Sequence, residues 1–238
     1  MRGCLFTLAL AAALLAAGVV VGLPAVAAGV LTAGVGAAGL QASDTTVTVA
    51  ADPPWDLLAL RADRVRLRAT SATFRGMRIG ALDVTFLGVS LLDRSATSVA
   101  GRLTGVTAPD VAGQPLTLGT VDLAGGGARV TATTTIAAAA ARSLVAGEIA
   151  SATGLAVAPS AIRLTAPDRV TARAAATTVS ATLAVDAGGD LVAEPASGAP
   201  VTLLRAGVDV PLRLTSATVD PAGNLVLVGE LTVGLLGG

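Results

Sequence analysis

Apolar and polar side chains alternate with a period of two along most of the chain after residue 44. The clearest runs lie at residues 65–70, 77–86, 179–186 and 208–215. Successive side chains of a β-strand point to opposite faces of a sheet, so such runs are typical of strands with one dry and one wet face. The pattern therefore predicts a β-dominated protein built on an antiparallel sheet.

One of these runs changes phase in its middle. Apolar residues occupy the odd positions Met77, Ile79 and Ala81, and the even positions from Leu82 onward. A phase change within one strand is typical of a β-bulge, which bends the strand. Arg75-Gly76, just before this run, favours a tight turn between two strands.

Turn signals also divide the C-terminal part of the chain. Gly188-Gly189 favours a turn, and Asp-Pro-Ala-Gly-Asn at residues 220–224 is a strong turn signal before a last strand at residues 225–233. Pro211 marks its own run as an edge strand or a bulge, because proline cannot donate a ladder hydrogen bond.

Residues 136–153 follow a helical pattern instead. This segment is rich in alanine, Thr135 is suited to be its N-cap, and Gly154 is suited to the position after its last turn. A shorter helical turn is expected over residues 55–60, because Pro53-Pro54 suits a helix N-terminus.

The main predicted helix has one apolar stripe. Leu144, Val145 and Ile149 can share one broad face, while Arg142 and Glu148 lie nearer its edges. We expect this stripe to pack against the concave side of the sheet. The predicted fold is therefore α+β and β-dominated, with a strongly curved antiparallel sheet wrapped around one main helix.

Few large side chains are available to fill such a fold. After the N-terminal segment the only aromatic residues are Trp55, Phe74 and Phe86. A bent sheet around an alanine-rich helix would leave room that an acyl chain could fill, since each buried CH₂ contributes about 0.8 kcal/mol. The alternative is a sheet that closes tightly on its small side chains.

The N-terminal segment indicates export. Arg2 is followed by residues 3–43 without any charge, and residues 5–21 are the most hydrophobic stretch. Ala25-Val26-Ala27 is typical of a signal-peptidase site, yet the stretch is also long enough to cross a bilayer. We therefore expect residues 1–27 to be a signal peptide or a membrane anchor, and either outcome places residue 44 onward outside the cytoplasm.

The remaining boundaries follow from composition. Residues 28–43 form an Ala/Gly-rich linker or a weak helix, and residues 44–238 form the β-rich domain. Cys4 is the only cysteine, so no disulfide framework is expected. It lies before the hydrophobic stretch, whereas a lipoprotein cysteine follows the end of such a stretch.

Composition argues against an enzyme. The chain has 16 basic and 16 acidic residues and no histidine, and all the basic residues are arginines. Hydrolytic triads and common zinc sites therefore lack their usual bases and ligands, so we expect no catalytic residues, cofactor or metal. An Asp83–Asp93 glycosidase pair is disfavoured, because aspartate is common at strand ends and turns. Zero net charge argues against nucleic-acid binding.

Three segments carry a resemblance to a known family. They are Val-Thr-Val-Ala-Ala-Asp-Pro-Pro-Trp-Asp-Leu-Leu at residues 47–58, Asp-Arg-Val-Arg-Leu-Arg at residues 63–68, and the strand pattern ending in Gly-Val at residues 76–89. Together with the order of later elements they resemble the LmeA-like phospholipid-binding family of bacterial cell-envelope proteins, over about residues 45–235. One departure is the Gly/Ala-rich segment at residues 24–41, where members often have a charged amphipathic helix.

The resemblance implies an extracytoplasmic phospholipid-binding or carrier protein with a fold like that of tubular lipid-binding domains. Its expected partners are phospholipid or another membrane lipid, and the membrane itself through the N-terminal segment. The candidate acyl-chain contacts are Trp55, Leu58, Phe74, Phe86, Leu144, Val145 and Ile149.

Arginines are the candidate contacts for anionic lipid head groups. Arg66, Arg68 and Arg78 can share one sheet face, although a solvated polar face is the simpler interpretation of such residues. The second hypothesis for the whole protein is a structural or adhesive envelope module that is not catalytic and carries no ligand.

Overall fold

The computed structural model describes residues 40–74, 76–93, 95–111, 114–127, 129–174, 177–210 and 212–232, together with Ala25, Ala28, Gly29 and Gly36. Those four earlier residues have helical backbone conformation. Apart from them, the expected leader at residues 1–27 and most of the expected linker lie outside the described residues. Within the described part, no helix combines the length and apolar character needed to cross a membrane.

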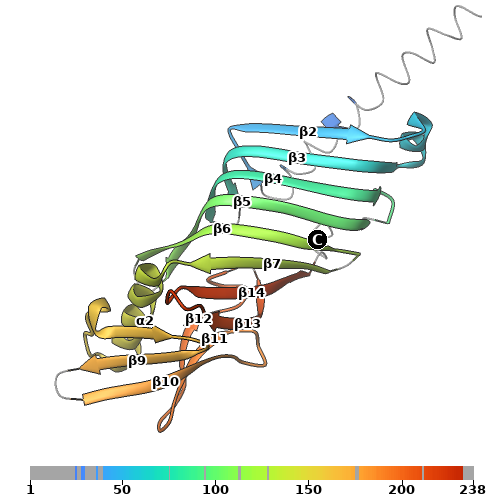
Figure 1. The fold of residues 1–238 in the computed structure, drawn as a ribbon. Coiled ribbons are helices and arrows are strands. Elements are labelled where there is room, and N and C mark those ends of the chain that lie inside the picture. Colours follow the sequence, from blue (N-terminus) through green and yellow to red (C-terminus); the bar gives the residue numbers. More distant parts are fainter. Residues whose placement is uncertain are drawn as a thin grey trace, which may run out of the picture.

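Antiparallel pairing joins nine of the described strands into a long sheet, and Figure 1 shows these strands lying side by side. Its order is β1-β3-β4-β5-β6-β7-β14-β13, with β2 beside β1 along the same edge of β3. The strands span Leu40–Gln41 (β1), Asp44–Ala50 (β2), Arg61–Phe74 (β3), Met77–Ser90 (β4), Ser95–Val111 (β5), Gln114–Gly126 (β6), Arg129–Ile136 (β7), Arg213–Val219 (β13) and Leu225–Thr232 (β14).

A smaller antiparallel sheet and the main helix lie at one end of this sheet (Figure 1). The small sheet has the order β12-β11-β10-β9-β8. Its strands span Ile162–Thr165 (β8), Arg169–Ala174 (β9), Thr177–Val185 (β10), Leu191–Pro195 (β11) and Val201–Leu204 (β12). Helix α2 spans Ala138–Thr153, and the short 3-10 helices η1 and η2 span Pro54–Ala59 and Pro159–Ala161.

The coarse fold prediction is confirmed. The protein is β-dominated, has one main helix among the described residues, and contains a strongly curved antiparallel sheet. The strands form two sheets instead of the single sheet expected. Helix α2 packs mainly on β8 and β12 of the small sheet and reaches the long sheet at β6.

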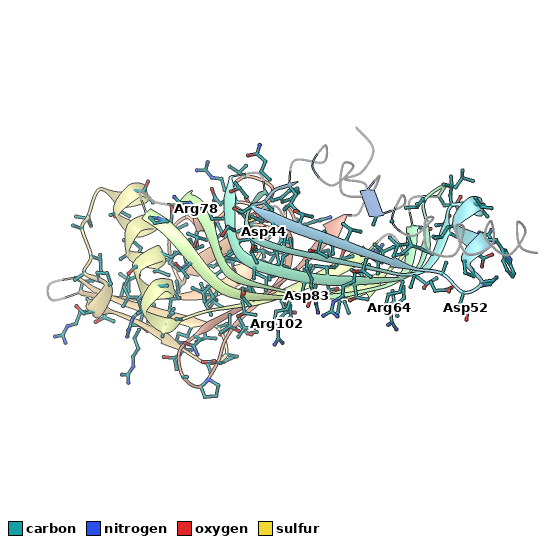
Figure 2. All side chains as sticks on the ribbon, turned by 90° about the horizontal axis from the view of Figure 1, so that it is seen from above. Asp44, Asp52, Arg64, Arg78, Asp83 and Arg102 are labelled. Atoms are coloured by element: carbon teal, nitrogen blue, oxygen red, sulfur yellow. The ribbon has the colours of Figure 1, made fainter. Side chains whose placement is uncertain are left out.

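Four neighbouring strands of the long sheet bend along one line. The line passes through Ser71 of β3, Gly80 of β4, Gly105 of β5 and Gly119 of β6, which register pairs place side by side. Ser71, Gly105 and Gly119 have positive φ values of 49°, 62° and 68°. Register shifts at Gly105 and Gly119 mark bulges between β5 and β6, and a bulge bends its strand. Strands β3 and β4 bend beside them without a register shift, and Figure 2 shows the resulting curvature.

The bend explains the phase change seen in the sequence. Inward-facing side chains before and after it are three positions apart in each of the four strands, as with the buried Ile79 and Leu82 in β4. The same spacing recurs in Ala69 and Ala72, in the partly buried Leu103 and the buried Val106, and in Leu118 and Val121. The predicted bend of β4 is found, but the predicted bulge is not, because β4 keeps an unbroken register with β3 and β5. The register shifts along this line lie between β5 and β6.

A buried threonine satisfies the backbone at this bend. The hydroxyl oxygen of Thr134 lies 2.9 Å from both the Leu118 and Thr120 carbonyl oxygens, on either side of Gly119. The Thr134 hydroxyl hydrogen is shared between these two carbonyl oxygens, which both face Thr134 at the bend. Thr134 is the only buried polar side chain among the described residues, and its role follows from the need to pair buried carbonyls.

The N-terminus of α2 is capped from a distant turn. The helix begins later than predicted, with Ala137 as its N-cap, so the assignment of that role to Thr135 is wrong. Asn224 instead accepts a hydrogen bond from the Ala138 N–H at 3.0 Å through its side-chain Oδ1. The Asp220 carboxylate holds this asparagine by accepting from its backbone N–H and its Nδ2, each at 2.9 Å. These bonds lower the pKa of Asp220.

Removing this cap should weaken the protein. Asn224→Ala leaves the Ala138 N–H without its side-chain acceptor, and loss of a cap costs about 1 kcal/mol. For a protein of this size that lowers the melting temperature by about 2–4 °C. The control is Thr135→Ala at the exposed position predicted from the sequence, which should stay within about 0.5 kcal/mol of wild type. Equal losses in the two variants would contradict capping by Asn224.

Three of the predicted turns are present in the structure, but one predicted strand is not. The turn at residues 220–224, the hairpin at Gly76 and the turn at Gly188-Gly189 are confirmed. A strand starting at Val208 is wrong, because the chain forms a turn there and β13 begins only at Arg213. Pro211 lies outside the described residues, but β13 is an edge strand with a register shift, as that proline led us to expect.

Candidate functional site

The concave face of the long sheet is apolar. One cross-strand row runs from Val84 through Gly101, Leu123 and Ala132 to Gly229. The small residues of this row are closely packed: Ala132 is almost fully buried, and an added Cβ at Gly101 would meet Val84. Flanking apolar side chains are only partly buried; they are Leu67, Phe86, Leu103 and Leu123.

An apolar groove lies where this sheet meets the main helix. It has a volume of about 400 Å³ and lies between the start of β6, one face of α2 and the loop before η2. The described residues that line it are uncharged; they are Pro115, Leu116, Thr117, Ala140, Ser143, Leu144, Ala146, Gly147, Ala150, Ala156, Val157 and Pro159. Volume and apolar lining both fall within the range of small-molecule sites.

The predicted stripe of α2 faces the interior. Leu144 and Val145 are buried and belong to the main core, and Ile149 is partly buried against that core. Leu144 also lines the groove, whereas Val145 and Ile149 are not among its described lining residues. Glu148 lies nearer the edge of the helix, where burial and the neighbouring Asp209 raise its pKa.

The two phenylalanines lie far apart on the concave side. Phe74 ends β3, beyond the bend, and pairs in register with Met77. Phe86 pairs with Val65 and Val99 on the long part of the sheet. Both are partly buried and pack against the main core, but neither lines the groove beside α2.

Trp55 and Leu58 lie outside the interior. They are 65% and 67% exposed, whereas Leu57 between them is buried. Both belong to η1, at the end of the long sheet opposite α2 (Figure 1). Trp55, a candidate acyl-chain contact, is therefore not an interior residue, because η1 turns the intervening Leu57 towards the sheet.

The opposite, convex face of the long sheet carries a ladder of charges. Register pairs align Arg68, Asp83, Arg102 and Asp122 on four successive strands. Figure 2 shows Arg64, Asp83 and Arg102 along this face. A wider depression of about 460 Å³ lies on it, lined by Arg68 and Arg102 together with Asp44 and Asp83. Opposite charges balance there, so this depression favours no particular ion.

Asp83 forms ion pairs with two of the candidate head-group arginines. Arg66 donates two hydrogen bonds to its carboxylate, at 2.8 and 2.6 Å, and Arg68 donates a third at 3.2 Å. Hydrogen bonding from Arg66, followed by the smaller contribution of Arg68, lowers the pKa of Asp83 to about 2. Arg66 and Arg68 therefore face away from the apolar side and already have an anionic partner.

Arg78 is placed differently. It is exposed and lies past the bend, at the end of the sheet where α2 also lies (Figure 2). Arg78 pairs with Thr107, which pairs with Thr117, and Thr117 lines the groove. Its backbone is thus two strands from the groove, or about 10 Å. Of the three candidate arginines, Arg78 has the best position for a ligand in the groove.

The sequence did not reveal most of the groove. Leu116 and Val157 come from segments that meet α2 only after the chain has folded. The described residues include no group of three or more His, Cys, Asp or Glu side chains that could hold a metal ion. No protein-family model, curated protein or solved structure matches the chain, so the resemblance to the LmeA-like family remains a prediction.

Proposed function

We propose that this chain is an extracytoplasmic phospholipid-binding or carrier protein of the bacterial cell envelope. The observation that carries the proposal is the groove of about 400 Å³ beside α2, whose described lining side chains are uncharged and mostly apolar. An acyl chain needs apolar surface and no polar partners, and each CH₂ that leaves water contributes about 0.8 kcal/mol.

The lining of the groove fits an acyl chain better than a polar ligand. Its polar side chains among the described residues are Thr117 and Ser143, and the Ser143 hydroxyl donates to the Ala139 carbonyl oxygen at 3.2 Å. The lining side chains therefore offer few partners to a polar ligand, and the remaining polar surface of the groove belongs to the backbone. The strong curvature of the long sheet supports the comparison with the curved sheets of tubular lipid-binding domains.

Arg78 is the proposed head-group contact. Its guanidinium presents donors that match a phosphate group, and it lies in the cross-strand row that reaches Thr117 of the groove. Arg66 and Arg68 are weaker candidates, because a lipid phosphate would have to displace the Asp83 carboxylate.

The alternative function is a structural or adhesive envelope module without ligand. It is favoured by the tight burial of small residues around the helix, where Ala141 and Ala132 are almost fully buried. An alanine core of this kind can close without any lipid, and the groove is then only an irregularity of the surface.

Leu144→Trp separates the two functions. If the groove holds acyl chains, the indole fills it, the protein keeps its fold and less lipid co-purifies. If the groove is only an irregularity, the larger side chain overpacks the core at a cost of about 1–3 kcal/mol and lipid is absent from wild type as well. The measurements are the melting temperature and the lipid seen by native mass spectrometry or after extraction.

Val179→Trp is the matched control. Val179 is half exposed on β10 of the small sheet and is not among the residues that line the groove. This change should alter neither the melting temperature nor the amount of bound lipid. Wild-type protein that carries no lipid and takes up none from vesicles would contradict the proposal.

A further inference from the structure

The end of the long sheet opposite α2 exposes a cluster of large apolar side chains. This tip consists of η1, Leu60 and the loop between β4 and β5 (Figure 1). Trp55, Leu58, Leu60 and Leu92 are 65%, 67%, 45% and 75% exposed. Isolated apolar residues on a surface are normal, but a clustered set with a tryptophan is typical of a binding surface.

Local geometry holds these side chains together. In a 3-10 helix, residues three positions apart lie on the same side, so Trp55 and Leu58 share the outer side of η1. Leu57 faces inward and packs with Val49 and Ala62. The Leu91 N–H donates to the Leu60 carbonyl oxygen at 2.9 Å, which fixes the loop that carries Leu92 beside the end of η1.

The N-terminal segment reaches the same end of the molecule. Ala28 packs against the apolar cluster under η1, which contains Leu57 and Val65. The hydrophobic stretch at residues 5–21 ends seven residues before Ala28. A chain of that length spans at most about 25 Å. If residues 5–21 form a membrane segment, the C-terminal end of that segment therefore lies within about 25 Å of Ala28.

We infer that the tip docks into the surface of a lipid bilayer, with Trp55, Leu58, Leu60 and Leu92 at the level of the lipid head groups. Tryptophan is enriched at membrane interfaces because its ring is apolar and its N–H is polar. The long sheet then stands away from the membrane, with the groove beside α2 at its far end.

The charges at the tip determine which lipids it should prefer. Asp52, Asp56 and Asp63 lie on or beside η1, and Arg61 and Arg64 oppose them at the start of β3. Asp93 adds a further acid on the loop. These charges give no basic patch, so insertion should rest on apolar contact and should need no anionic lipid.

The only tryptophan of the chain is Trp55, so its fluorescence reports on the tip without any label. The full chain is reconstituted into phosphatidylcholine vesicles, with and without phosphatidylglycerol, using lipids brominated at different acyl positions. We expect water-like emission in buffer and a blue shift with quenching in vesicles, strongest for shallow bromines and unchanged by phosphatidylglycerol.

A pair of double variants tests the surface itself. Leu58→Asp combined with Leu92→Asp should weaken the insertion of the tip at least about tenfold, because each leucine contributes at least that factor on leaving water. Val179→Asp combined with Val208→Asp, at exposed positions outside the tip, should leave the quenching of Trp55 unchanged. Circular dichroism checks that both double variants fold.

Three results would overturn docking by the tip. They are emission that stays water-like in vesicles, quenching that survives the aspartate pair at the tip, and a blue shift that grows with protein concentration but shows no quenching. The last result would indicate self-association through the tip. Lipid bound in the groove is measured separately by mass spectrometry, so failure of the docking inference is distinguishable from failure of the proposed function.

Discussion

Replacing Val145 by aspartate is expected to leave little folded protein. Val145 is 1% exposed in the middle of α2 and belongs to the main core. An ionised carboxylate buried there has no partner, and the loss includes the valine packing as well. Changes of this kind cost more than about 4 kcal/mol, a large part of the 5–15 kcal/mol by which typical domains are stable. The measurement is the urea midpoint by circular dichroism.

The same chemical change at an exposed valine provides the control. Val179 is half exposed on β10, and Val179→Asp should change stability by no more than about 0.5 kcal/mol. Similar midpoints for the two variants would show that α2 does not join the two sheets into one core. A low midpoint for Val145→Asp alone supports the packing described here.

This core position could be predicted from the sequence. The helical spacing of Leu144, Val145 and Ile149 determined which side of α2 is buried, because a helix repeats its face every three to four residues. The partner of that stripe could not be predicted. Strands β8 and β12 are separated from each other by more than 30 residues, and alternation alone does not tell which sheet a strand joins.

The predicted site was less accurate than the fold. Leu144 lines the groove, but Trp55 and Leu58 are exposed at the other end of the molecule. The prediction for Trp55 rested on its place before Leu57-Leu58 in a short helix that starts at Pro53-Pro54. In the 3-10 helix η1, Leu57 is the buried residue instead. A segment of six residues is too short for its hydrophobic pattern to show which side chain faces inward.

Arginine placement shows a second limit of sequence reasoning. Alternation correctly put Arg66 and Arg68 on the face opposite the apolar side chains. It could not reveal that Asp83 lies directly across from Arg68 in the next strand, because that pairing depends on the register of the β3–β4 hairpin. Gly76, in the turn of that hairpin, helps to set the register.

The bend across the sheet left a sequence signal that is clear only in retrospect. In each of four strands, two inward-facing apolar residues stand three positions apart with a serine or glycine between them. A single such break led to the prediction of a bulge in β4, where the structure has a bend without a register shift. Four breaks that fall side by side predict a curved sheet, because neighbouring strands then bend together.

Gly105→Val is therefore expected to destabilise the protein by about 1–3 kcal/mol. Gly105 has a φ of 62°, where a β-branched residue carries about that much backbone strain. Its Cβ would lie 3.4 Å from the Gly80 Cα, so the γ-methyl groups of valine add some crowding against the facing strand. The free energy of unfolding measures the total.

Gly127→Val isolates the contribution of the bend. Gly127 has nearly the same φ, 63°, but lies at the β6–β7 turn, where an added Cβ would meet nothing within 4 Å. This variant carries the backbone strain without the contact on Gly80, so it should lose less stability than Gly105→Val. Hydrogen exchange should also quicken in β5 and β6 beyond the bend for Gly105→Val alone, because these segments are held in place by the curvature. Equal losses and equal exchange in the two variants would mean that the row of small residues does not hold the sheet in its curved form.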